Sequence, residues 1–251
     1  MHAMTTYPSL AERVVFVSGG GSGIGAALVE HFALQGARVA FCDVDDAAST
    51  VLVAKLAATS KHTPRFGHCD IQDIAAYQAH LAEVEAELGA IRVLVNNAGN
   101  DARHTLAELT PEYWDRCQAL NLKHQVFAIQ QVAPGMAAAG GGSIINLGSI
   151  SWMRGRANLV GYTTAKAAIS GLSRTLAREL EGRLAHARTL VPEPLHETLK
   201  DLESVCEERR QLAVQVNLHE WLHCWEFIHV PLSYALLVMS AVHATIATLK
   251  Y

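Results

Sequence analysis

The chain has 251 residues, half of them apolar, and a formal net charge of −4 at pH 7. This length suits one large α/β domain, alone or with an appendage, and the mild negative charge lacks the basic footprint of a nucleic-acid-binding protein. Its five scattered cysteines form no disulfide framework, and the first ten residues contain no apolar signal region. We therefore expect a reducing compartment, the cytoplasm.

The first predicted element is a buried strand over residues 13–18, which is rich in valine. It leads into the glycine-rich stretch 19–25 and then into apolar residues at helical spacing up to Gly36. Glycines let the backbone adopt positive φ and approach a pyrophosphate, and the amino end of the next helix favours that negative charge. A glycine cluster alone is often only a flexible turn, but one placed between a strand and a helix indicates a dinucleotide site.

Two further strands are predicted to end at acidic residues, residues 38–42 at Asp43 and residues 65–69 at Asp70. Asp43 follows Gly19 by twenty-four residues. A carboxylate at this spacing suits the two ribose hydroxyls of NAD and would repel the 2′-phosphate of NADP. Asp70 could accept a hydrogen bond from an adenine amino group. We therefore predict NAD as the cofactor.

A helix is predicted over residues 74–88, and a fourth strand over residues 92–95 runs into Asn96 and Asn97. These two amides could brace the sheet and leave space for a cofactor. Asn121 lies in an otherwise apolar helical stretch, where a buried amide needs hydrogen-bond partners. It could be a core polar group that bends the helix, or it could hold a water in a proton path behind a lysine.

A fifth strand, predicted to be buried, covers residues 143–148 and ends at Ser149. The helical pattern that begins at Tyr162 also contains Lys166, and the spacing of four places both side chains on one helix face. An ammonium group beside a phenol stabilises the phenolate, so the tyrosine could take a proton while Ser149 orients the reacting oxygen. Such tyrosine–lysine pairs are common by chance, and the upstream nucleotide site gives this one its weight.

Together, these motifs resemble the short-chain dehydrogenase/reductase family in order and spacing over about residues 8–182. The resemblance implies an α/β fold, a Rossmann-like doubly wound parallel sheet in three αβα layers, and a homo-oligomer. It implies catalysis by Asn121, Ser149, Tyr162 and Lys166. The nucleotide-binding residues that it implies are Gly19, Ser22, Gly23, Ile24, Gly25, Asp43, Asp70, Ile71, Asn97, Tyr162 and Lys166.

Within that family, residues 96–104, 110–115 and 148–152 resemble the NAD-dependent dehydrogenases that oxidise an aldose at C1. This resemblance implies that a pentose such as xylose is converted to its lactone. The substrate contacts that it implies are Asn100, Arg103, His104, Ser149, Trp152 and Tyr162. Trp152 could instead be ordinary core packing. The alternative function is a non-catalytic, NAD-binding remnant of such an enzyme.

The resemblance ends near Gly182, and we interpret residues 1–182 as the NAD-binding core and residues 183–251 as an atypical helical tail. The family would continue with two more strands, of which only residues 187–192 resemble one. Residues 227–249 contain no Asp, Glu, Lys or Arg. This stretch could span a bilayer with some tilt, or it could form a buried or dimer-forming helix.

The same tail contains His219, Glu220 and His223, which match a zinc-binding pattern. Too little sequence surrounds the pattern to build a protease domain, and histidines are frequent here, so we predict no metal site. His229 and His243 flank an apolar segment in a way that faintly resembles membrane cytochrome b helices. One helix could not form such a haem site alone.

Overall fold

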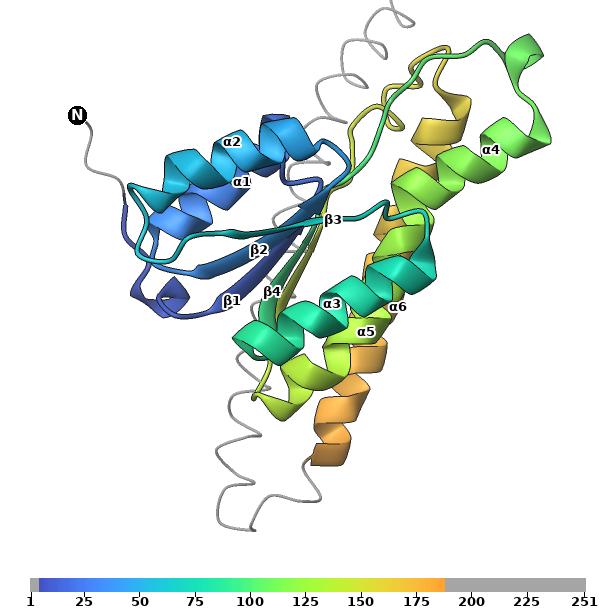
Figure 1. The fold of residues 1–251 in the computed structure, drawn as a ribbon. Coiled ribbons are helices and arrows are strands. Elements are labelled where there is room, and N and C mark those ends of the chain that lie inside the picture. Colours follow the sequence, from blue (N-terminus) through green and yellow to red (C-terminus); the bar gives the residue numbers. More distant parts are fainter. Residues whose placement is uncertain (1–4, 188–251) are drawn as a thin grey trace, which may run out of the picture. The chain divides into compact units, whose positions relative to one another are not determined.

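The computed structural model describes residues 5–187, and residues 181–187 by their backbone only. Five parallel strands form one sheet, in the order β3-β2-β1-β4-β5 (Figure 1). The strands are β1 (Val14–Ser18), β2 (Arg38–Asp43), β3 (Arg65–His68), β4 (Ile91–Asn96) and β5 (Ser143–Asn146). The α-helices are α1 (Gly23–Leu34), α2 (Asp46–Ala57), α3 (Ile74–Leu88), α4 (Pro111–Gln118), α5 (His124–Ala138) and α6 (Val160–Ala187). Shorter helical turns are η1 (Pro8–Leu10), η2 (Leu106–Glu108) and the π-helical η3 (Ala119–Lys123).

The strand order places the change of direction at β1. The chain moves outwards from β1 through β2 to β3, and α3 then returns it to β4 on the other side of β1. In doubly wound sheets, a crevice for ligands opens at such a point, at the carboxyl ends of the strands. The glycine-rich stretch after β1 and the asparagines at the end of β4 therefore lie at neighbouring strand ends.

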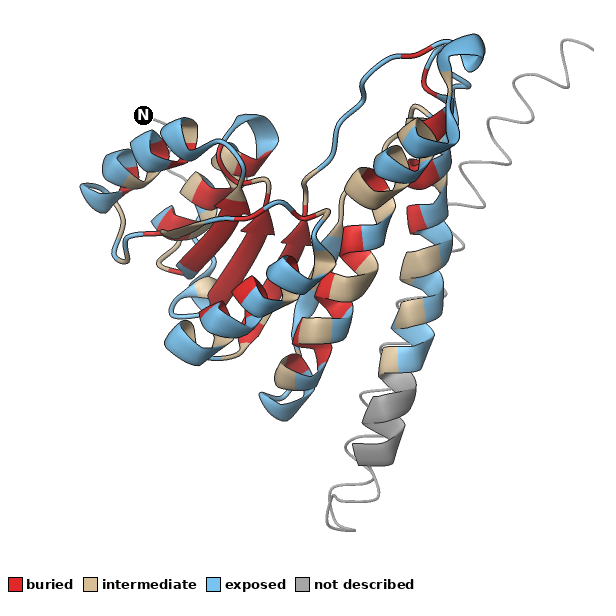
Figure 2. Ribbon diagram, turned by 45° about the vertical axis from the view of Figure 1, so that its right-hand side comes forward, coloured by how far each residue is buried: buried red, intermediate tan, exposed pale blue. Residues whose placement is uncertain are grey.

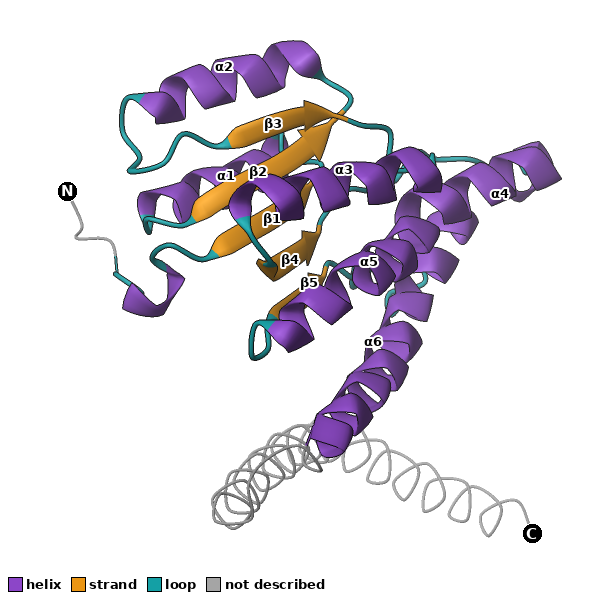
Figure 3. Ribbon diagram, turned by 60° about the horizontal axis from the view of Figure 1, so that its bottom comes forward, coloured by secondary structure: helices purple, strands orange, loops and turns teal. Residues whose placement is uncertain are grey.

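Helices cover both faces of this sheet, with α1 and α2 on one side and α3 and α5 on the other (Figure 3). Alternate residues of β1 serve the two layers. Val15 and Val17 pack with Val29 of α1, whereas Phe16 packs with Leu81 of α3. Because β1 is buried on both faces, it reads in the sequence as one continuous apolar run. Figure 2 shows the buried strands between the two helical layers. The predicted three-layer α/β fold is confirmed.

The predicted buried strand over residues 143–148 is corrected on two counts. β5 ends at Asn146, and its residues Ser143 and Ile145 are exposed, with Ile145 at 41%. Among residues 5–187, β5 pairs with β4 alone. An apolar run reports the hydrophobicity of a strand and not the presence of a covering layer, so this edge position was not visible in the pattern.

α6 runs without interruption from Val160 to Ala187 and therefore passes Gly182, where the tail was predicted to begin. Ala187 is helical, and residues 188–192 of the predicted strand remnant lie outside the described residues. The same holds for residues 227–249 and for the zinc-like and haem-like histidine patterns. Within residues 5–187, no helix is both long and apolar enough to cross a membrane, and no group of side chains could hold a metal ion.

The carboxylate of Glu12 forms ion pairs with three basic side chains, and their contribution to stability can be tested. This carboxylate contacts Lys61 at 2.6 Å, His62 at 2.8 Å and Arg38 at 3.1 Å. Hydrogen bonds from Lys61, His62 and Arg38 lower the pKa of Glu12 to about 2. Because the pKa is lower in the folded state, the stabilisation is complete above the ordinary value of 4.5 and is lost as pH falls from there towards 2.

We therefore expect Glu12→Gln to lower Tm by roughly 1–3 °C at pH 7, because exposed ion pairs contribute little each. The difference from the unmodified protein should shrink to less than half at pH 3, measured by thermal unfolding. Glu30→Gln, which removes a single pair with Lys55, is the matched control. An equal deficit at pH 7 and pH 3 would contradict this account.

Candidate active site

The glycine-rich stretch between β1 and α1 is a tight turn held against β2. The N–H groups of Gly19 and Gly20 donate to the carbonyl oxygen of Cys42 at 2.8 and 3.1 Å. Gly19 has a φ of +67°, in the left-handed region that favours glycine. A Cβ on Gly25 would overlap the carbonyl oxygen of Gly19. The predicted need for glycine at these positions is therefore steric.

The amino end of α1 is open to a ligand. The N-cap residue Ser22 makes no side-chain cap hydrogen bond, and a Cβ on Gly23 would meet no atom within 4 Å. Ser22, Gly23 and Ile24 are all exposed. First-turn N–H groups lack partners within a helix, and together with the helix dipole they favour an anion. The pyrophosphate of a dinucleotide fits this turn.

Asp43 is fixed at the carboxyl end of β2, beside the same turn. Its Oδ2 accepts a hydrogen bond from the N–H of Gly21 at 2.8 Å. Its Oδ1 accepts from the N–H groups of Val44 at 2.8 Å and Asp45 at 3.0 Å. The carboxylate is therefore oriented by backbone donors alone. It lies where the sequence predicts the ribose of the cofactor.

Asp70 and Ile71 follow β3 at the same edge of the sheet. Asp70 is exposed, and its Oδ1 accepts a hydrogen bond from the N–H of Gln72 at 2.9 Å. Ile71 is buried and belongs to the core cluster on the α3 side of the sheet. The side-chain amide of Gln72 also donates to Asp70 Oδ1 at 3.2 Å and to Oδ2 at 3.4 Å, so a ligand would share this exposed carboxylate with Gln72.

The two asparagines at the carboxyl end of β4 brace the sheet, as predicted. The side-chain amide of Asn97 donates to the carbonyl oxygens of Ser18 and Gly19, both at 2.9 Å. The side-chain amide of Asn96 donates to Asn146 Oδ1 at 2.8 Å. These bonds join β1, β4 and β5 at their carboxyl ends, so the turn after β1 and the loop after β4 are held as one surface.

Lys166 is the buried cation of the site. It is 4% exposed, and its Nζ donates to the carbonyl oxygen of Leu147 at 2.8 Å. The same Nζ lies 5.7 Å from the centre of the Tyr162 ring, one helical turn away on α6. Burial lowers the pKa of Lys166. The predicted pairing of Tyr162 and Lys166 on one face of a helix is confirmed by this geometry.

Asn121 and Lys166 both lie next to Gly99, in the loop after β4. A Cβ on Gly99 would lie 2.9 Å from Asn121 Oδ1 and 3.4 Å from Lys166 Nζ. Asn121 is buried in η3, where its amide donates to the carbonyl oxygen of Cys117 at 3.0 Å. Its Oδ1 accepts from the N–H of Asn100 at 2.9 Å. Asn121 is therefore a satisfied polar group in a π-helical turn, and it also contacts the loop beside the lysine.

Ser149 lies two residues after Leu147, the residue whose carbonyl oxygen binds Lys166. Its hydroxyl donates to Ser151 Oγ at 3.0 Å and accepts from the N–H of Ser151 at 3.1 Å. In the described part of the chain, no hydrogen bond joins Ser149 to Tyr162. The serine is thus brought to the correct strand end with its hydroxyl engaged by its own loop.

The predicted substrate residues divide into exposed and buried ones. Asn100 and Arg103 are exposed, and Trp152 is 38% exposed. Trp152 is therefore not buried core packing. His104 differs from the prediction, because it is 6% exposed and its Nδ1 lies 3.1 Å from the hydroxyl of Tyr113. Its ring is engaged inside the protein, and a free substrate contact is not available to it.

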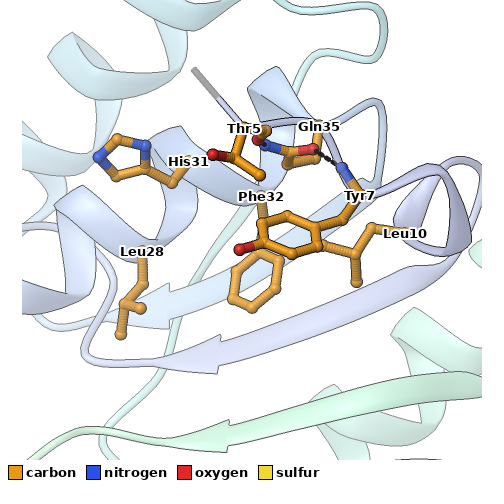
Figure 4. A pocket seen from close by; sticks show the side chains of 7 residues that line it. All are labelled: Thr5, Tyr7, Leu10, Leu28, His31, Phe32 and Gln35. Atoms are coloured by element: carbon orange, nitrogen blue, oxygen red, sulfur yellow. Dashed lines mark hydrogen bonds between the residues drawn. The ribbon is translucent and has the colours of Figure 1, made fainter. Parts of the chain in front are cut away.

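A separate hollow lies on the other side of α1 (Figure 4). Its lining residues come from the N-terminal segment, from α1 and from the C-cap of α1: Thr5, Tyr7, Leu10, Leu28, His31, Phe32 and Gln35. The N–H of Tyr7 donates to Gln35 Oε1 at 2.8 Å across it. Because the nucleotide turn lies at the opposite, amino end of α1, this hollow is not part of the candidate active site.

Comparison with protein families decides the identity of this arrangement. The model of the short chain dehydrogenase family matches residues 13–198. The chain belongs to this family. The match extends past Gly182, so the resemblance continues into residues that the structure does not describe. Members of the short-chain dehydrogenase family are oxidoreductases that use a nicotinamide cofactor, and this accounts for the turn after β1.

Three relatives illustrate the similarity. The chain is 52% identical to D-xylose 1-dehydrogenase of Caulobacter vibrioides over 174 residues, which are 69% of this chain and 68% of that protein. It is 48% identical to a probable galactose dehydrogenase of Rhizobium meliloti, with the same coverage of 69% and 68%. A metagenomic short-chain oxidoreductase, solved in complex with NADP, superposes with a TM-score of 0.66 at 32% identity, over 69% of this chain and 79% of that one.

Several groups that shape this short-chain dehydrogenase site were not identified from the sequence. The carbonyl oxygen of Leu147 holds Lys166, and a backbone atom carries no signal of its own in the sequence. The start of α6 next to Tyr162 contains Gly161, and two residues of α4, Cys117 and Gln118, lie against it. Gly161 directly precedes the tyrosine, and this position could have suggested a close contact, since glycine is otherwise unfavourable in a helix.

Gly99 tests the convergence of Asn121 and Lys166. We expect Gly99→Ala to lower kcat about tenfold and to lower Tm as well, because its Cβ would displace Asn121 Oδ1 from the N–H of Asn100. Steady-state kinetics and thermal unfolding measure the two effects. Gly171→Ala, where a Cβ on α6 would meet no atom within 4 Å, is the matched control and should keep full activity. Unchanged kcat in Gly99→Ala would show that the contact is not needed.

Proposed function

We propose that this short-chain dehydrogenase is an NAD-dependent sugar dehydrogenase, which oxidises the C1 hydroxyl of an aldose, a pentose such as xylose, to a lactone. The observation that carries the proposal is the position of Lys166, which lies beside the Tyr162 ring and, like Asn121, next to Gly99 in the loop after β4. The names of the relatives from Caulobacter and Rhizobium support a sugar as the substrate.

In this proposal, Tyr162 accepts the proton of the C1 hydroxyl group. Tyr162 acts as the phenolate, which the nearby Lys166 ammonium stabilises, and it becomes a neutral phenol when it takes up this proton. Lys166 uses one of its three N–H donors on Leu147, which leaves two for a ribose hydroxyl or a water. Its burial keeps bulk water from competing for those donors.

The remaining residues of the proposed site orient the reactants. Ser149 would turn its hydroxyl from Ser151 to the reacting oxygen, and Asn121 would support the exchange of protons behind Lys166. A nicotinamide nucleotide bound at the turn after β1 would supply the acceptor for the hydride from C1. Asn100 and Arg103 would bind sugar hydroxyls, and Trp152 would pack against the sugar ring.

The preference for NAD rests on Asp43. Its carboxylate is oriented by three backbone N–H groups and is followed by Val44 and not by a cation. A negative charge in this place favours ribose hydroxyls and repels a phosphate. The solved relative that contains NADP makes this a point for direct measurement. We further propose a cytoplasmic homo-oligomer, with a boundary near Gly182 and a tail whose residues 227–249 contact either a membrane or another helix.

A second candidate function, an NAD-binding protein without turnover, is favoured by one observation. Ile145 in the middle of β5 is 41% exposed, and β5 is the edge strand in the described part of the chain. An uncovered edge next to Ser149 would leave the substrate side of the site open to water. NAD binding measured by titration, with no turnover of any aldose by folded protein, would establish this function.

Tyr162→Phe tests the proposed chemistry. Purified protein should reduce NAD with a pentose, followed as absorbance at 340 nm, and a panel of pentoses and hexoses defines the substrate. The variant loses only the hydroxyl and should reduce kcat at least about 100-fold, since it lacks the proton acceptor. Its affinity for NAD should remain within about twofold. Full turnover by Tyr162→Phe would refute the proposal.

Asp43→Asn tests the choice of cofactor, because the amide keeps the size and one of the two acceptor oxygens while it removes the charge. The ratio of kcat/KM with NAD to that with NADP should fall about tenfold. Asp46→Asn removes an exposed charge from the first turn of α2 and serves as the control. An unmodified enzyme that prefers NADP would overturn the assignment of NAD.

A further inference from the structure

Gly161 links the position of Tyr162 to the elements that surround the start of α6. It lies in the first turn of α6, directly before the tyrosine, and it is buried. N–H groups in the first turn of a helix have no partner within the helix, so a buried one must be satisfied from elsewhere. The position of this residue therefore depends on groups outside α6.

His104 supplies the acceptor for that N–H group. Its Nε2 accepts a long hydrogen bond of 3.5 Å from Gly161, and its own backbone N–H donates to Asn158 at 3.0 Å. The imidazole comes from the loop after β4, more than fifty residues away in sequence, and is 6% exposed. It acts as a cap for α6 that is provided by another part of the chain.

The partners of His104 determine its tautomer. Because Nε2 accepts from Gly161, the ring proton of the neutral imidazole must be on Nδ1. Nδ1 lies 3.1 Å from the hydroxyl of Tyr113, which itself donates to the carbonyl oxygen of Ala102 at 3.2 Å. The two rings also pack, with centres 4.7 Å apart. Every donor in this sequence of hydrogen bonds thus has an acceptor.

Two further contacts fix Gly161 from the side of α4. The side-chain amide of Gln118 donates to the carbonyl oxygen of Gly161 at 3.0 Å. A Cβ on Gly161 would lie 3.0 Å from the sulfur of Cys117. The sulfur of Cys117 also lies 3.5 Å from the amide of Asn121. The start of α6 is therefore held by the same segment that holds Asn121.

We propose that His104 is a positioning residue for the oxidation: as the Nδ1–H tautomer it caps Gly161 and fixes the place of Tyr162 relative to Asn121. The role rests on the proposed function of Tyr162 in proton transfer. In this role, His104 positions the catalytic tyrosine and does not bind the substrate. His104, which follows Asn100 and Arg103 in the same loop, thereby determines the position of the tyrosine on α6.

The tautomer is measurable without any substrate. In protein labelled with ¹⁵N at histidine, the His104 ring is identified as the signal absent from His104→Gln. We expect a neutral ring with the proton on Nδ1. Tyr113→Phe removes one acceptor of that proton but leaves the carbonyl oxygen of Ala102, 3.4 Å from Nδ1, so the proton should stay on Nδ1 in this variant. A His104 ring with its proton on Nε2 in the unmodified protein would overturn the proposal, whatever the activity of the enzyme.

Kinetics distinguish positioning from a merely structural role. His104→Phe keeps a ring against Tyr113 but can neither accept nor donate, so kcat should fall about 10- to 100-fold while KM for NAD stays within about twofold. His104→Gln retains an acceptor and a donor and should recover kcat to within about fivefold of the unmodified enzyme. His31→Phe, an exposed histidine at the end of α1, is the control for the same chemical change.

The outcomes separate the two proposals. Loss of kcat in His104→Phe with recovery in His104→Gln supports the positioning role. Unchanged kcat in folded His104→Phe, or equal loss in both variants, overturns it while Tyr162→Phe still reports on the chemistry. Should His104→Phe fail to fold, as measured by thermal unfolding, the tautomer measurement and the kinetics of His104→Gln decide. If no sugar is oxidised, the proposed function fails and the tautomer measurement still decides the cap.

Discussion

A buried ammonium group is the constraint on which the site depends. An isolated charge inside a protein is costly unless it is hydrogen-bonded, and burial lowers the pKa of Lys166. The carbonyl oxygen of Leu147 meets that need at 2.8 Å, and this contact ties the end of β5 to α6. Gly99 has no side chain, and so the loop after β4 can lie close to both the lysine and Asn121. One charge thus brings three separate segments together.

The sheet makes this meeting possible because all its strands are parallel. Their carboxyl ends lie at one edge, where Asn96 and Asn97 join β1, β4 and β5 through side-chain amides. The turn after β1 is held to β2 by the carbonyl oxygen of Cys42. Nucleotide turn and buried lysine are consequently parts of one hydrogen-bonded surface, and the helices behind it supply the hydrophobic packing.

Most of the fold could be predicted from periodicity. The helix over residues 74–88 matches α3 at both ends, and the valine-rich run of β1 is buried on both faces. β5 was predicted incorrectly as buried, because an apolar run does not reveal whether a neighbour covers it. The nucleotide turn was predictable because its glycines are required by overlap of backbone atoms, which any sequence for this fold must respect.

The site was predictable only where a side chain carries the chemistry. The spacing of Tyr162 and Lys166, together with the upstream nucleotide site, made both residues predictable. The acceptor of Lys166 on Leu147 is a backbone atom, which the sequence does not reveal. His104 was assigned to the substrate because a polar residue in a loop beyond the cofactor suggests contact. Its partners, Tyr113 and Gly161, lie 9 and 57 residues away, and such pairings depend on the packed tertiary structure.

The amide of Asn121 has a consequence for anyone who wishes to alter the enzyme. Its Oδ1 receives the N–H of Asn100, while its own N–H group contacts the residue of α4 that packs on Gly161. Substitutions around it are therefore coupled, and their effects will not add. If a library randomises the loop after β4 and the start of α6 separately, most combinations of the two segments will lose these shared contacts. Recombining the two segments as a single cassette would keep their shared contacts intact.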